Sequence, residues 1–403
     1  MDLPKGWTTV PLDNLLDYEQ PQKYIVESTA YSDSYPTPVL TAGKSFIIGH
    51  TNEIEGVYKD NLPVIIFDDF TTATQFVTFP FKVKSSAMKM LQPVSSELDI
   101  KYLYYRMQFI RHNAATHKRY WISDYSKNAV ELPPLAEQHR IVAKIDALFS
   151  KLDKGVETLQ TIRQQLRMYR QAVLKWAFEG KEWEMRSLAE LGDLGRGKSR
   201  HRPRNDPRLF IDGKYPFIQT GAVKAAHGII KDYDTMYGEF GLQQSKSWPV
   251  GTLCITIAAN IADTAFLGIE ACFPDSVVGF TANEELVRPK YVDYFIQTAK
   301  QMLWYYAPAT AQKNINLTTL ENLMVPYCSL EEQAQIISEI ESRLSVCDKL
   351  EQIVDENLSK AQALKQSILK KAFAGQLVPQ DPSDEPAEEL LKRIRNTLSA
   401  KRK

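Results

Sequence analysis

The feature that most constrains the fold is an internal repeat. Residues 130–180 align without a gap to residues 325–375, at a constant offset of 195. The match is clearest at the end of each copy, where LKWAFEG in the first corresponds to LKKAFAG in the second. A long gapless agreement at one offset is the signature of a duplicated structural unit. We therefore expect two equivalent elements in one chain, each preceded by a different segment of similar length.

Each copy of the repeat has the pattern of one long helix. Apolar residues recur at alternating steps of four and three, which is the a/d pattern of a coiled coil. Ser329 and Glu332 form a capping box before the second copy, prolines precede the first, and a glycine follows each. The predicted seam residues are Ile141, Ile145, Leu148, Leu152, Leu159, Ile162, Leu166 and Val173 in the first copy, and Ile336, Ile340, Leu350, Val354, Leu364 and Ile368 in the second.

The two helices are expected to pair within the chain. A helix of about 40 residues is about 60 Å long, and alone its apolar stripe would face water. Two such helices can bury their stripes against each other, which predicts an intramolecular antiparallel coiled coil. The alternative is that each helix caps its neighbouring domain or drives association between separate chains.

The segments outside the repeat are predicted to be β-rich domains. They contain short apolar runs such as 63–70 and 251–269, bounded by Gly, Pro, Asn or Asp. Each ends in an aromatic helical stretch, at 101–110 and 290–306. The predicted fold class is α+β, with two mixed α/β domains separated by two long helices. The expected boundaries are 1–132 for the first domain, 133–180 for the first helix, 181–327 for the second domain, 328–376 for the second helix and 377–403 for a C-terminal tail, whose charge pattern is compatible with a short docking helix.

Composition limits the function classes. The 403 residues carry 49 Lys and Arg against 49 Asp and Glu, so basic charge for nucleic-acid binding has to be local or come from partners. The cysteines Cys254, Cys272, Cys328 and Cys347 lack C-x-x-C spacing and are expected to be reduced thiols, not metal ligands. Neither a signal peptide nor a membrane span is expected, which predicts a cytoplasmic protein.

The sequence contains no convincing catalytic motif. The six histidines are dispersed, and the Asn/Asp-Pro-Pro-Tyr/Phe motif of amino-methyltransferases is absent. Residues 192–199, GDLGRGKS, match the P-loop pattern. However, the preceding MRSLAEL does not have a strand pattern and prolines follow, so we interpret the match as fortuitous. We expect no catalytic residue, no metal site and no cofactor on this chain, and an enzyme that uses this segment is the alternative.

Taken together, the repeats and domains resemble the specificity subunit of type I restriction–modification systems. The resemblance covers nearly the whole chain and rests on the junction ELPPLAEQHRIVAKIDALF (131–149), its second copy VPYCSLEEQAQIISEIE (325–341), the segment ATAQKNI (309–315) and the helix ends LKWAFEGKEW and LKKAFAGQLVPQDPSDEP. The second junction departs from the first, because Cys-Ser-Leu-Glu replaces Pro-Leu-Ala. The resemblance implies that each domain reads one half of a split asymmetric site in double-stranded DNA, while the helices set the half-site spacing.

The resemblance also implies partners. Two modification subunits are expected to dock on the helices, bind S-adenosylmethionine and methylate adenine, while a separate motor-nuclease subunit cleaves DNA. Through YEQPQKYIV (18–26) and PVLTAGKSFIIGHTNE (38–53), among other stretches, the first domain resembles readers associated with a GAA half-site. A hypothesis from another class is a structural coiled-coil scaffold whose β-rich domains bind protein or glycan.

Candidate DNA contacts come from basic and polar segments of both domains, since cations position phosphates and polar side chains read base edges. A basic arm at 196–208 is expected to follow phosphates or enter a minor groove, although a solvated loop is the usual form of such a run. Asp68 and Asp69 are interpreted as a turn or a cytosine-facing acceptor, with a metal or acid–base pair as the enzymatic alternative. The candidates are Thr41, Lys44, Asp69, Lys82, Lys84, Ser86, Lys89, Lys118 and Arg119 in the first domain, and Arg196, Lys198, Arg200, Arg202, Arg204, Gln219, Thr220, Gln243, Lys246 and Asn260 in the second.

Overall fold

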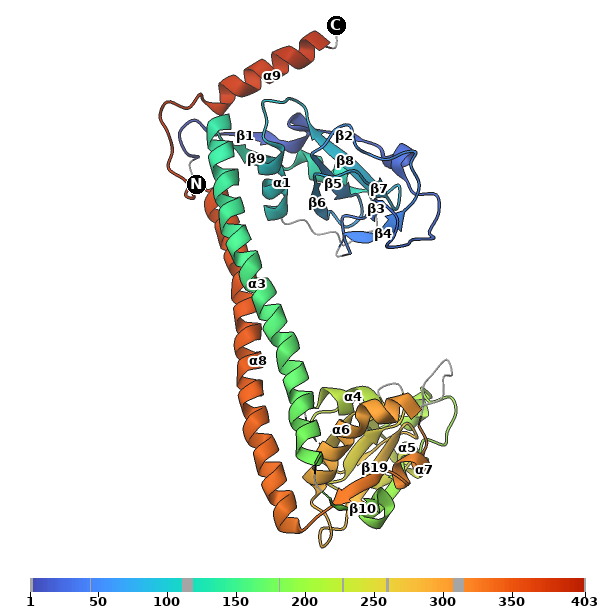
Figure 1. Cartoon of the computed structure of the whole chain (residues 1–403). Helices are drawn as coiled ribbons and strands as arrows, with labels where there is room; N and C mark the ends of the chain where they lie inside the picture. The colour runs from blue at the N-terminus through green and yellow to red at the C-terminus, as the bar shows by residue number, and fades with distance from the viewer. Residues whose placement is uncertain are drawn as a thin grey trace. The chain divides into compact units, whose positions relative to one another are not determined.

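The structure is a computed structural model of the chain (Figure 1). It describes residues 3–43, 45–110, 119–180, 182–226, 228–258, 261–306 and 315–401. The chain divides into two units, one made of residues 1–159 and 356–403 and the other of residues 160–355. Each unit contains one β-rich domain together with part of both long helices.

The two predicted long helices are confirmed. Helix α3 spans Leu135–Phe178 and helix α8 spans Leu330–Phe373 (Figure 1). The first turn of each helix contains a fully buried glutamine from the repeated Glu-Gln pair, Gln138 in α3 and Gln333 in α8. The side-chain oxygen of Gln138 accepts a hydrogen bond from the N–H of Asp99 (3.2 Å), directly before the domain helix α1 (Ile100–Phe109). That of Gln333 accepts one from the N–H of Arg288 (2.8 Å), directly before the domain helix α6 (Pro289–Tyr306). The repeat therefore fixes each long helix to its domain in the same way.

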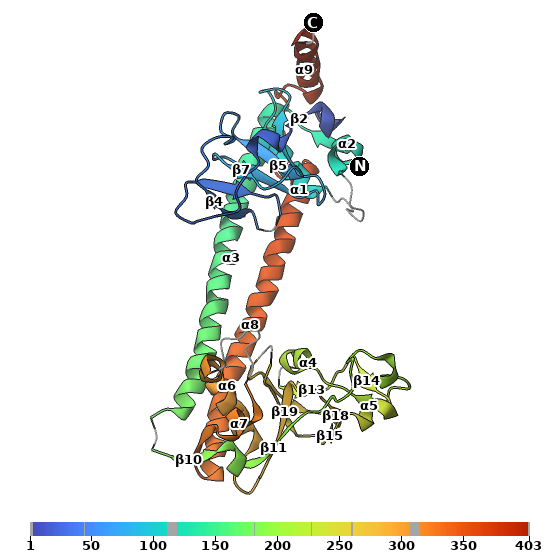
Figure 2. The same cartoon turned by 90° about the vertical axis from the view of Figure 1, so that its right-hand side faces the viewer.

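The helices pack against each other within each unit (Figure 2). In the second unit, Arg163 of α3 pairs with Asp355 of α8, and seven residues further along α3 Arg170 pairs with Asp348, seven residues earlier in α8. The paired residues therefore run forward along α3 and backward along α8, so the two helices are antiparallel. In the first unit, Lys365 of α8 pairs with Asp153 of α3, and apolar residues of both helices share one buried cluster. The antiparallel pairing within one chain is confirmed.

The seam is narrower than the heptad pattern predicts. Leu350 and Leu364 are 41% and 48% exposed, so their assignment to the seam is wrong. Between Ile340 and Ile368 the buried seam positions of α8 recur at intervals of seven residues or a multiple of seven, whereas Leu350 and Leu364, which lie three or four residues from these positions, are exposed. The exposed side of α3 likewise carries Tyr169 and Trp176. The predicted seam residues Ile336, Ile340, Val354 and Ile368 of α8 are buried, as is Cys347. In α3, Ile141, Ile145, Leu166 and Val173 are buried while Leu148, Leu152, Leu159 and Ile162 are half-buried.

The first domain is built on two small sheets. The first has the strand order β2-β8-β5-β6 and is antiparallel throughout, and the second has the order β4-β3-β7. Strand β1 pairs with β9 and so joins the two ends of the domain directly before α3. The elements are β1 Thr8–Pro11, β2 Leu16–Glu19, β3 Thr37–Leu40, β4 Ile47–Thr51, β5 Val64–Asp68, β6 Thr74–Val77, β7 Lys82–Val83, β8 Met88–Pro93, β9 Ala129–Leu132, α1 Ile100–Phe109, α2 Tyr120–Ser123, and the short 3-10 turns Leu12–Asn14, Pro21–Tyr24 and Tyr125–Lys127.

The second domain is built on a five-stranded sheet in the order β11-β19-β16-β17-β13, and β10 pairs with β20 directly before α8. Two further strand pairs, β12-β14 and β15-β18, lie outside this sheet. The elements are β10 Glu184–Ser187, β11 Gly192–Arg196, β12 Tyr215–Pro216, β13 Ile229–Ile230, β14 Met236–Tyr237, β15 Ser247–Trp248, β16 Leu253–Thr256, β17 Thr264–Leu267, β18 Ala271–Cys272, β19 Val277–Ala282, β20 Met324–Tyr327, α4 Thr220–Ala225, α5 Glu239–Gln243, α6 Pro289–Tyr306, α7 Leu317–Glu321, and the 3-10 turns Leu188–Glu190 and Pro207–Leu209.

The C-terminal tail folds back on the first unit. Helix α9 spans Ala387–Lys401, and its apolar side chains, including Leu390 and Ile394, belong to the buried cluster of the first domain. The N–H of Ala387 donates to the carbonyl oxygen of Gly6 (2.9 Å), and Arg393 pairs with Glu97 (2.7 Å). Among the described residues, none of the helices is long and apolar enough to cross a bilayer.

Candidate nucleic-acid interface

Backbone hydrogen bonds join separate candidate segments of the first domain. The N–H of Lys84 donates to the carbonyl oxygen of Leu40 (3.2 Å), which places it beside Thr41. The hydroxyl of Thr41 donates to the carbonyl oxygen of Ser45 (3.0 Å) and accepts from the N–H of Gly43 (3.2 Å), so it caps the β3–β4 turn. These contacts hold Thr41 next to Lys84.

The segment around Asp69 adds two more candidates to the same region. The N–H of Asp69 donates to the carbonyl oxygen of Ala87 (2.8 Å), which follows Ser86. The carbonyl oxygen of Asp69 accepts from the N–H of Tyr120 (2.8 Å), which follows Arg119. The accessible members of this region form what we term the first-domain surface. It consists of the exposed Lys84, Ser86 and Arg119 and the half-buried Thr41.

Asp68 and Asp69 have different roles. The Oδ1 atom of Asp68 accepts from the N–H groups of Phe70 and Thr71, both at 2.9 Å, which is the pattern of an Asx turn. The interpretation of Asp68 as a turn residue is confirmed. Asp69 is buried and only 1% exposed, so the alternative that it faces a cytosine from the surface is wrong.

Two lysine candidates of the first domain are also buried. The ammonium of Lys82 donates to the carbonyl oxygen of Glu55 (2.8 Å) and pairs with Glu53 (2.6 Å). Lys89 is 1% exposed and pairs with Asp69 (3.2 Å). A cation enclosed in this way cannot reach a phosphate or a base edge. The prediction that Lys82, Lys89 and Asp69 contact DNA directly is therefore wrong, and these residues instead connect parts of the first domain.

The P-loop match in the second domain has a different geometry. Residues 192–196 form strand β11, and the N–H of Lys198 donates to the carbonyl oxygen of Phe273 (3.1 Å), whereas a P-loop needs a helix that starts at this point. The next helical element in the described chain is the turn Pro207–Leu209. The interpretation as a fortuitous match is confirmed, although one of its reasons was wrong, because MRS lies in strand β10.

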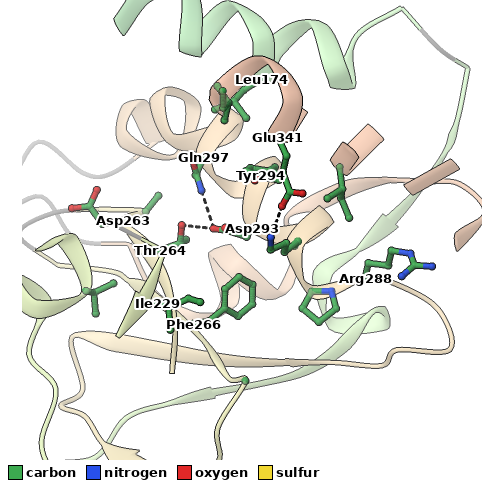
Figure 3. A pocket seen from close by; sticks show the side chains of 18 of the residues that line it. Leu174, Ile229, Asp263, Thr264, Phe266, Arg288, Asp293, Tyr294, Gln297 and Glu341 are labelled. Atoms are coloured by element: carbon green, nitrogen blue, oxygen red, sulfur yellow. Dashed lines mark hydrogen bonds and ion pairs between the residues drawn. The ribbon is translucent and has the colours of Figure 1, made fainter. Parts of the chain in front are cut away.

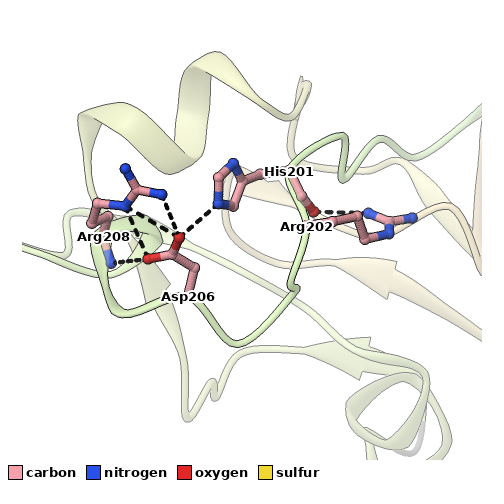
Figure 4. A network of polar contacts seen from close by, with 4 residues as sticks. All are labelled: His201, Arg202, Asp206 and Arg208. Carbon is pink, nitrogen blue, oxygen red and sulfur yellow. Dashed lines mark hydrogen bonds and ion pairs between the residues drawn. The ribbon is translucent and has the colours of Figure 1, made fainter.

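Part of the basic arm is fixed by acidic residues (Figure 4). The carboxylate of Asp206 accepts from the ring of His201 and from the guanidinium of Arg208, each at 2.7 Å. These hydrogen bonds, that of Arg208 first, lower the pKa of Asp206 below its usual range. Arg204 pairs with Asp275 (2.6 Å), which also lies 3.9 Å from Arg202. The arm therefore has a defined course, and much of its charge is compensated.

The remaining cations of the arm meet another candidate segment. The N–H of Arg200 donates to the carbonyl oxygen of Gln244 (3.1 Å), and the hydroxyl of Ser245 donates to the carbonyl oxygen of Lys198 (2.8 Å). Among the described residues, the exposed side chains of Lys198 and Arg200 have no hydrogen bond or ion pair of their own. Together these residues form what we term the second-domain surface. It consists of Lys198, Arg200, Gln243 and Lys246.

Other candidates are not brought to this surface. Arg196 is exposed and donates to the carbonyl oxygen of Asp275. Gln219 and Thr220 lie at the start of α4, where no hydrogen bond in the described chain connects them to the second-domain surface. Lys44, Lys118 and Asn260 lie outside the described residues. Within those limits, no group of three His, Cys, Asp or Glu side chains could hold a metal ion, and all four cysteines are buried.

A second kind of site, which the sequence analysis missed, lies beside the long helices. In the second unit, a groove of about 1550 Å³ lies beside α6 (Figure 3). Its wall contains Asp293, which accepts from the hydroxyl of Thr264 (2.5 Å) and the amide of Gln297 (3.0 Å). Burial raises the pKa of this carboxyl group. Tyr294 and Glu341 line the same groove.

A smaller groove of about 670 Å³ lies beside α1 in the first unit, and most of its lining residues have an equivalent in the lining of the larger groove. Residues of α1 and α6 correspond at an offset of 189, and residues of α3 and α8 at the repeat offset of 195. The equivalent pairs are Tyr105 with Tyr294, Gln108 with Gln297, Asp146 with Glu341, Asp153 with Asp348, Lys365 with Arg170, Gln366 with Gln171 and Leu369 with Leu174.

The contacts within the two grooves correspond as well. Lys101 pairs with Asp146 (2.7 Å) as Lys290 pairs with Glu341. The ion pair of Lys365 with Asp153 corresponds to that of Arg170 with Asp348. These groups are between a quarter and two-thirds exposed, and such pairs contribute little to stability. The signal in the sequence was the pair of aromatic stretches at 101–110 and 290–306, which share the pattern Lys-Tyr-x-x-Tyr.

Comparison with known proteins identifies the family. Residues 4–166 and 180–358 both match the family model described as "Type I restriction modification DNA specificity domain". The chain belongs to this family. It is 32% identical over 347 residues to the EcoR124I/EcoR124II specificity subunit of Escherichia coli, a match that covers 81% of this chain and 84% of that relative. The EcoBI specificity subunit of Escherichia coli is 26% identical over 63% of this chain and 60% of its own length.

Solved structures of the family share the fold. A chain from a study of complex assembly and conformational transition of the type I R-M system has a TM-score of 0.72 at 18% identity, with coverage of 93% of this chain and all of that one. The HsdS subunit from Thermoanaerobacter tengcongensis has a TM-score of 0.51 at 18% identity, with coverage of 93% and 98%. The predicted α+β class with two long paired helices is confirmed.

Proposed function

We propose that this chain is the DNA sequence-specificity subunit of a type I restriction–modification complex, acting in the cytoplasm without catalysing a covalent step itself. Each of its two domains reads one half of a split asymmetric site in double-stranded DNA. The observation that carries the proposal is the double match to the DNA specificity family on two domains that differ from each other. Their attachment to the repeated helices through Gln138 and Gln333 supports one shared task for two different readers.

The surfaces supply the chemistry that reading needs. Lys84 and Arg119 in the first domain, and Lys198 and Arg200 in the second, offer exposed cations to phosphates. Neighbouring Ser86 and Gln243 offer the hydroxyl and amide groups that bond base edges in a groove. The neutral net charge of the chain fits a subunit that shares the grip on DNA with partners.

The paired helices are proposed to set the half-site spacing. Helices α3 and α8 each have 44 residues, about 65 Å at 1.5 Å per residue, without an internal break. Readers in successive major-groove segments on one side of a duplex are about 34 Å apart. An antiparallel pair bends less than a single helix, so it can hold a constant spacing.

The two grooves are proposed to dock two copies of the modification subunit, which bind S-adenosylmethionine and methylate adenine. Grooves lined by equivalent side chains can bind the same partner twice, so one asymmetric chain can recruit two identical subunits. The exposed apolar row of the helices, with Tyr169, Trp176 and Leu350, lies on the same long helices and provides apolar contact area.

Filling either groove should remove one modification subunit. Gln171 and Gln366 are equivalent, exposed groove residues without a hydrogen bond among the described residues, so Gln171→Trp and Gln366→Trp add bulk at little cost to folding. Native mass spectrometry should find two modification subunits per wild-type chain, one for each single variant and none for the double variant. The matched variants Gln171→Ala and Gln366→Ala should retain both subunits. Two subunits on the double tryptophan variant would refute docking in the grooves.

The proposed function is tested by mapping methylated adenines in cells that express this chain with its modification subunit. Methylation should appear at one bipartite sequence, and the resemblance of the first domain predicts GAA in one half. Exchange of the second domain for that of a relative should change the other half only. Binding to protein or glycan without site-specific methylation would favour the scaffold hypothesis instead.

A further inference from the structure

A buried ion pair lies beneath the first-domain surface. The Nζ atom of Lys89 lies 3.2 Å from Oδ2 of Asp69, and the two side chains are 1% and 2% exposed. The same ammonium lies 4.5 Å from the centre of the Tyr18 ring, a cation–π contact that encloses it further. Because neither charged group is exposed to solvent, the pair can influence the surface only through the segments that are hydrogen-bonded to Asp69.

Asp69 holds two neighbouring segments at once. Its Oδ1 atom accepts from the N–H of Trp121 (2.8 Å), in the first turn of α2, where helix amides lack partners within the helix. Its backbone carbonyl oxygen accepts from the N–H of Tyr120, and its N–H donates to the carbonyl oxygen of Ala87, each at 2.8 Å. Asp69 thus connects the turn after β5 both to the start of α2 and to the segment before β8.

The connected segments are the ones that carry the candidate DNA contacts. Arg119 directly precedes the two residues of α2 that bond to Asp69, and Ser86 directly precedes Ala87. A base-edge hydrogen bond is effective only over a few tenths of an ångström around its best length. Small movements of either segment would therefore weaken reading of the first half-site.

The pair is poorly suited to a purely stabilising role. Desolvation of two charges offsets most of their attraction, and replacement of buried ion pairs by apolar residues is often neutral or stabilising. The carboxylate that pairs with Lys89 nevertheless accepts the hydrogen bond from the N–H of Trp121, and such charge-assisted hydrogen bonds are shorter and stronger than those between neutral groups. The charges of Asp69 and Lys89 therefore serve to fix the position of the segments that are hydrogen-bonded to Asp69.

We propose that the buried Asp69–Lys89 pair positions Ser86 for base reading and Arg119 for phosphate contact, and so determines how sharply the first domain distinguishes its half-site. The inference rests on the proposed function. It assigns Asp69 and Lys89 as positioning residues, which act on DNA through their neighbours and not by contact.

The test separates positioning from stability. Asp69→Asn keeps an oxygen for the N–H of Trp121 without the charge, and Lys89→Met fills the space of the lysine stem. Lys89→Met alone leaves an unpaired buried carboxylate and should lower the melting temperature markedly, whereas the double variant should melt within a few degrees of wild type. Binding of the full chain with its modification subunits is measured on duplexes with one base changed in either half-site. In the double variant, discrimination at the first half-site should fall about tenfold and that at the second should not change.

A second ion pair in the same domain provides the control. Lys82→Met with Glu53→Gln removes an ion pair whose side chains, within the described part of the chain, form no hydrogen bond with Asp69 or with the segments bonded to it, and discrimination should stay as in wild type. Full first-half discrimination in the Asp69→Asn/Lys89→Met variant would overturn the inference, as would an equal loss at both half-sites. Either result leaves the proposed function standing as long as the wild-type complex is site-specific, whereas a wild-type complex without site preference would refute the proposed function itself.

Discussion

Insertion of four residues into both long helices will move methylation to sites whose half-sites lie about two base pairs farther apart. Four residues add about 6 Å of helix, and successive base pairs are about 3.4 Å apart. The insertions belong after Leu159 in α3 and after Leu358 in α8. These points face each other, because Arg163 pairs with Asp355 and the helices are antiparallel. Sites with the original spacing should lose methylation at least tenfold, measured by sequencing of methylated adenines.

The matched control is the same insertion in α3 alone. It shifts one helix against the other, so that the ion pairs of Arg163 and Arg170 on one side of the insertion can no longer form together with the ion pair of Asp153 and Lys365 on the other side. This variant should lose site-specific methylation at every spacing. Methylation by the doubly extended chain at the original spacing would mean that the helices do not set the distance, and the spacing proposal would be wrong.

The long helices could be predicted because the apolar heptad pattern occurs in both copies of the repeat. A heptad pattern shows which residues are apolar, but not how much of the stripe one partner helix covers. Leu350 and Leu364 fit the pattern and still face solvent, because the antiparallel partner covers only the row that contains Val354 and Ile368. That outcome depends on how the two helices approach each other, which neither sequence copy contains.

The buried charges were misassigned for a related reason. Lys89 lies in β8, where Met88 and Met90 are buried on one face and Leu91 is buried on the same face as Lys89. The strand is therefore covered on both faces, and alternation gives no sign of an inward-facing cation. Asp69 follows an apolar strand and resembles any turn residue until its partner across the sheet is known. In a short sequence window, a lysine next to serines looks equally suited to a phosphate or to a buried carboxylate.

The equivalent grooves were missed because two offsets are involved. The long helices correspond at 195 residues, whereas α1 and α6 correspond at 189, since the connections between domain helix and long helix differ in length. A search for equivalent residues at the offset of 195 pairs Asp146 with Glu341 but does not pair Tyr105 with Tyr294. The second-domain surface likewise depends on contacts of Arg200 with residues more than forty positions away, which local patterns do not show.

Removal of three cations from the second-domain surface should weaken DNA binding by about a hundredfold. In the variant Lys198→Ala/Arg200→Ala/Lys246→Ala, each lost phosphate contact costs on the order of 1 kcal/mol. Each phosphate contact also adds about 0.9 to the steepness of the fall of log affinity with log salt, so this dependence should become shallower by about two to three. Titration of the assembled complex with a duplex of its own site, at several salt concentrations, measures both quantities. Discrimination at the first half-site should not change.

The control variant has to remove the same number of positive charges from residues outside the second-domain surface. Lys175, Lys360 and Lys392 are exposed lysines of α3, α8 and α9, and their triple alanine variant also removes three positive charges. Its affinity and salt slope should stay close to wild type, because contact with phosphates and not total charge sets the slope. Equal losses in the two triple variants would show that Lys198, Arg200 and Lys246 act only through net charge. An enzyme that used Lys198 at a nucleotide would instead lose ATP hydrolysis at an unchanged salt slope, and that result would reverse the assignment of the arm to DNA.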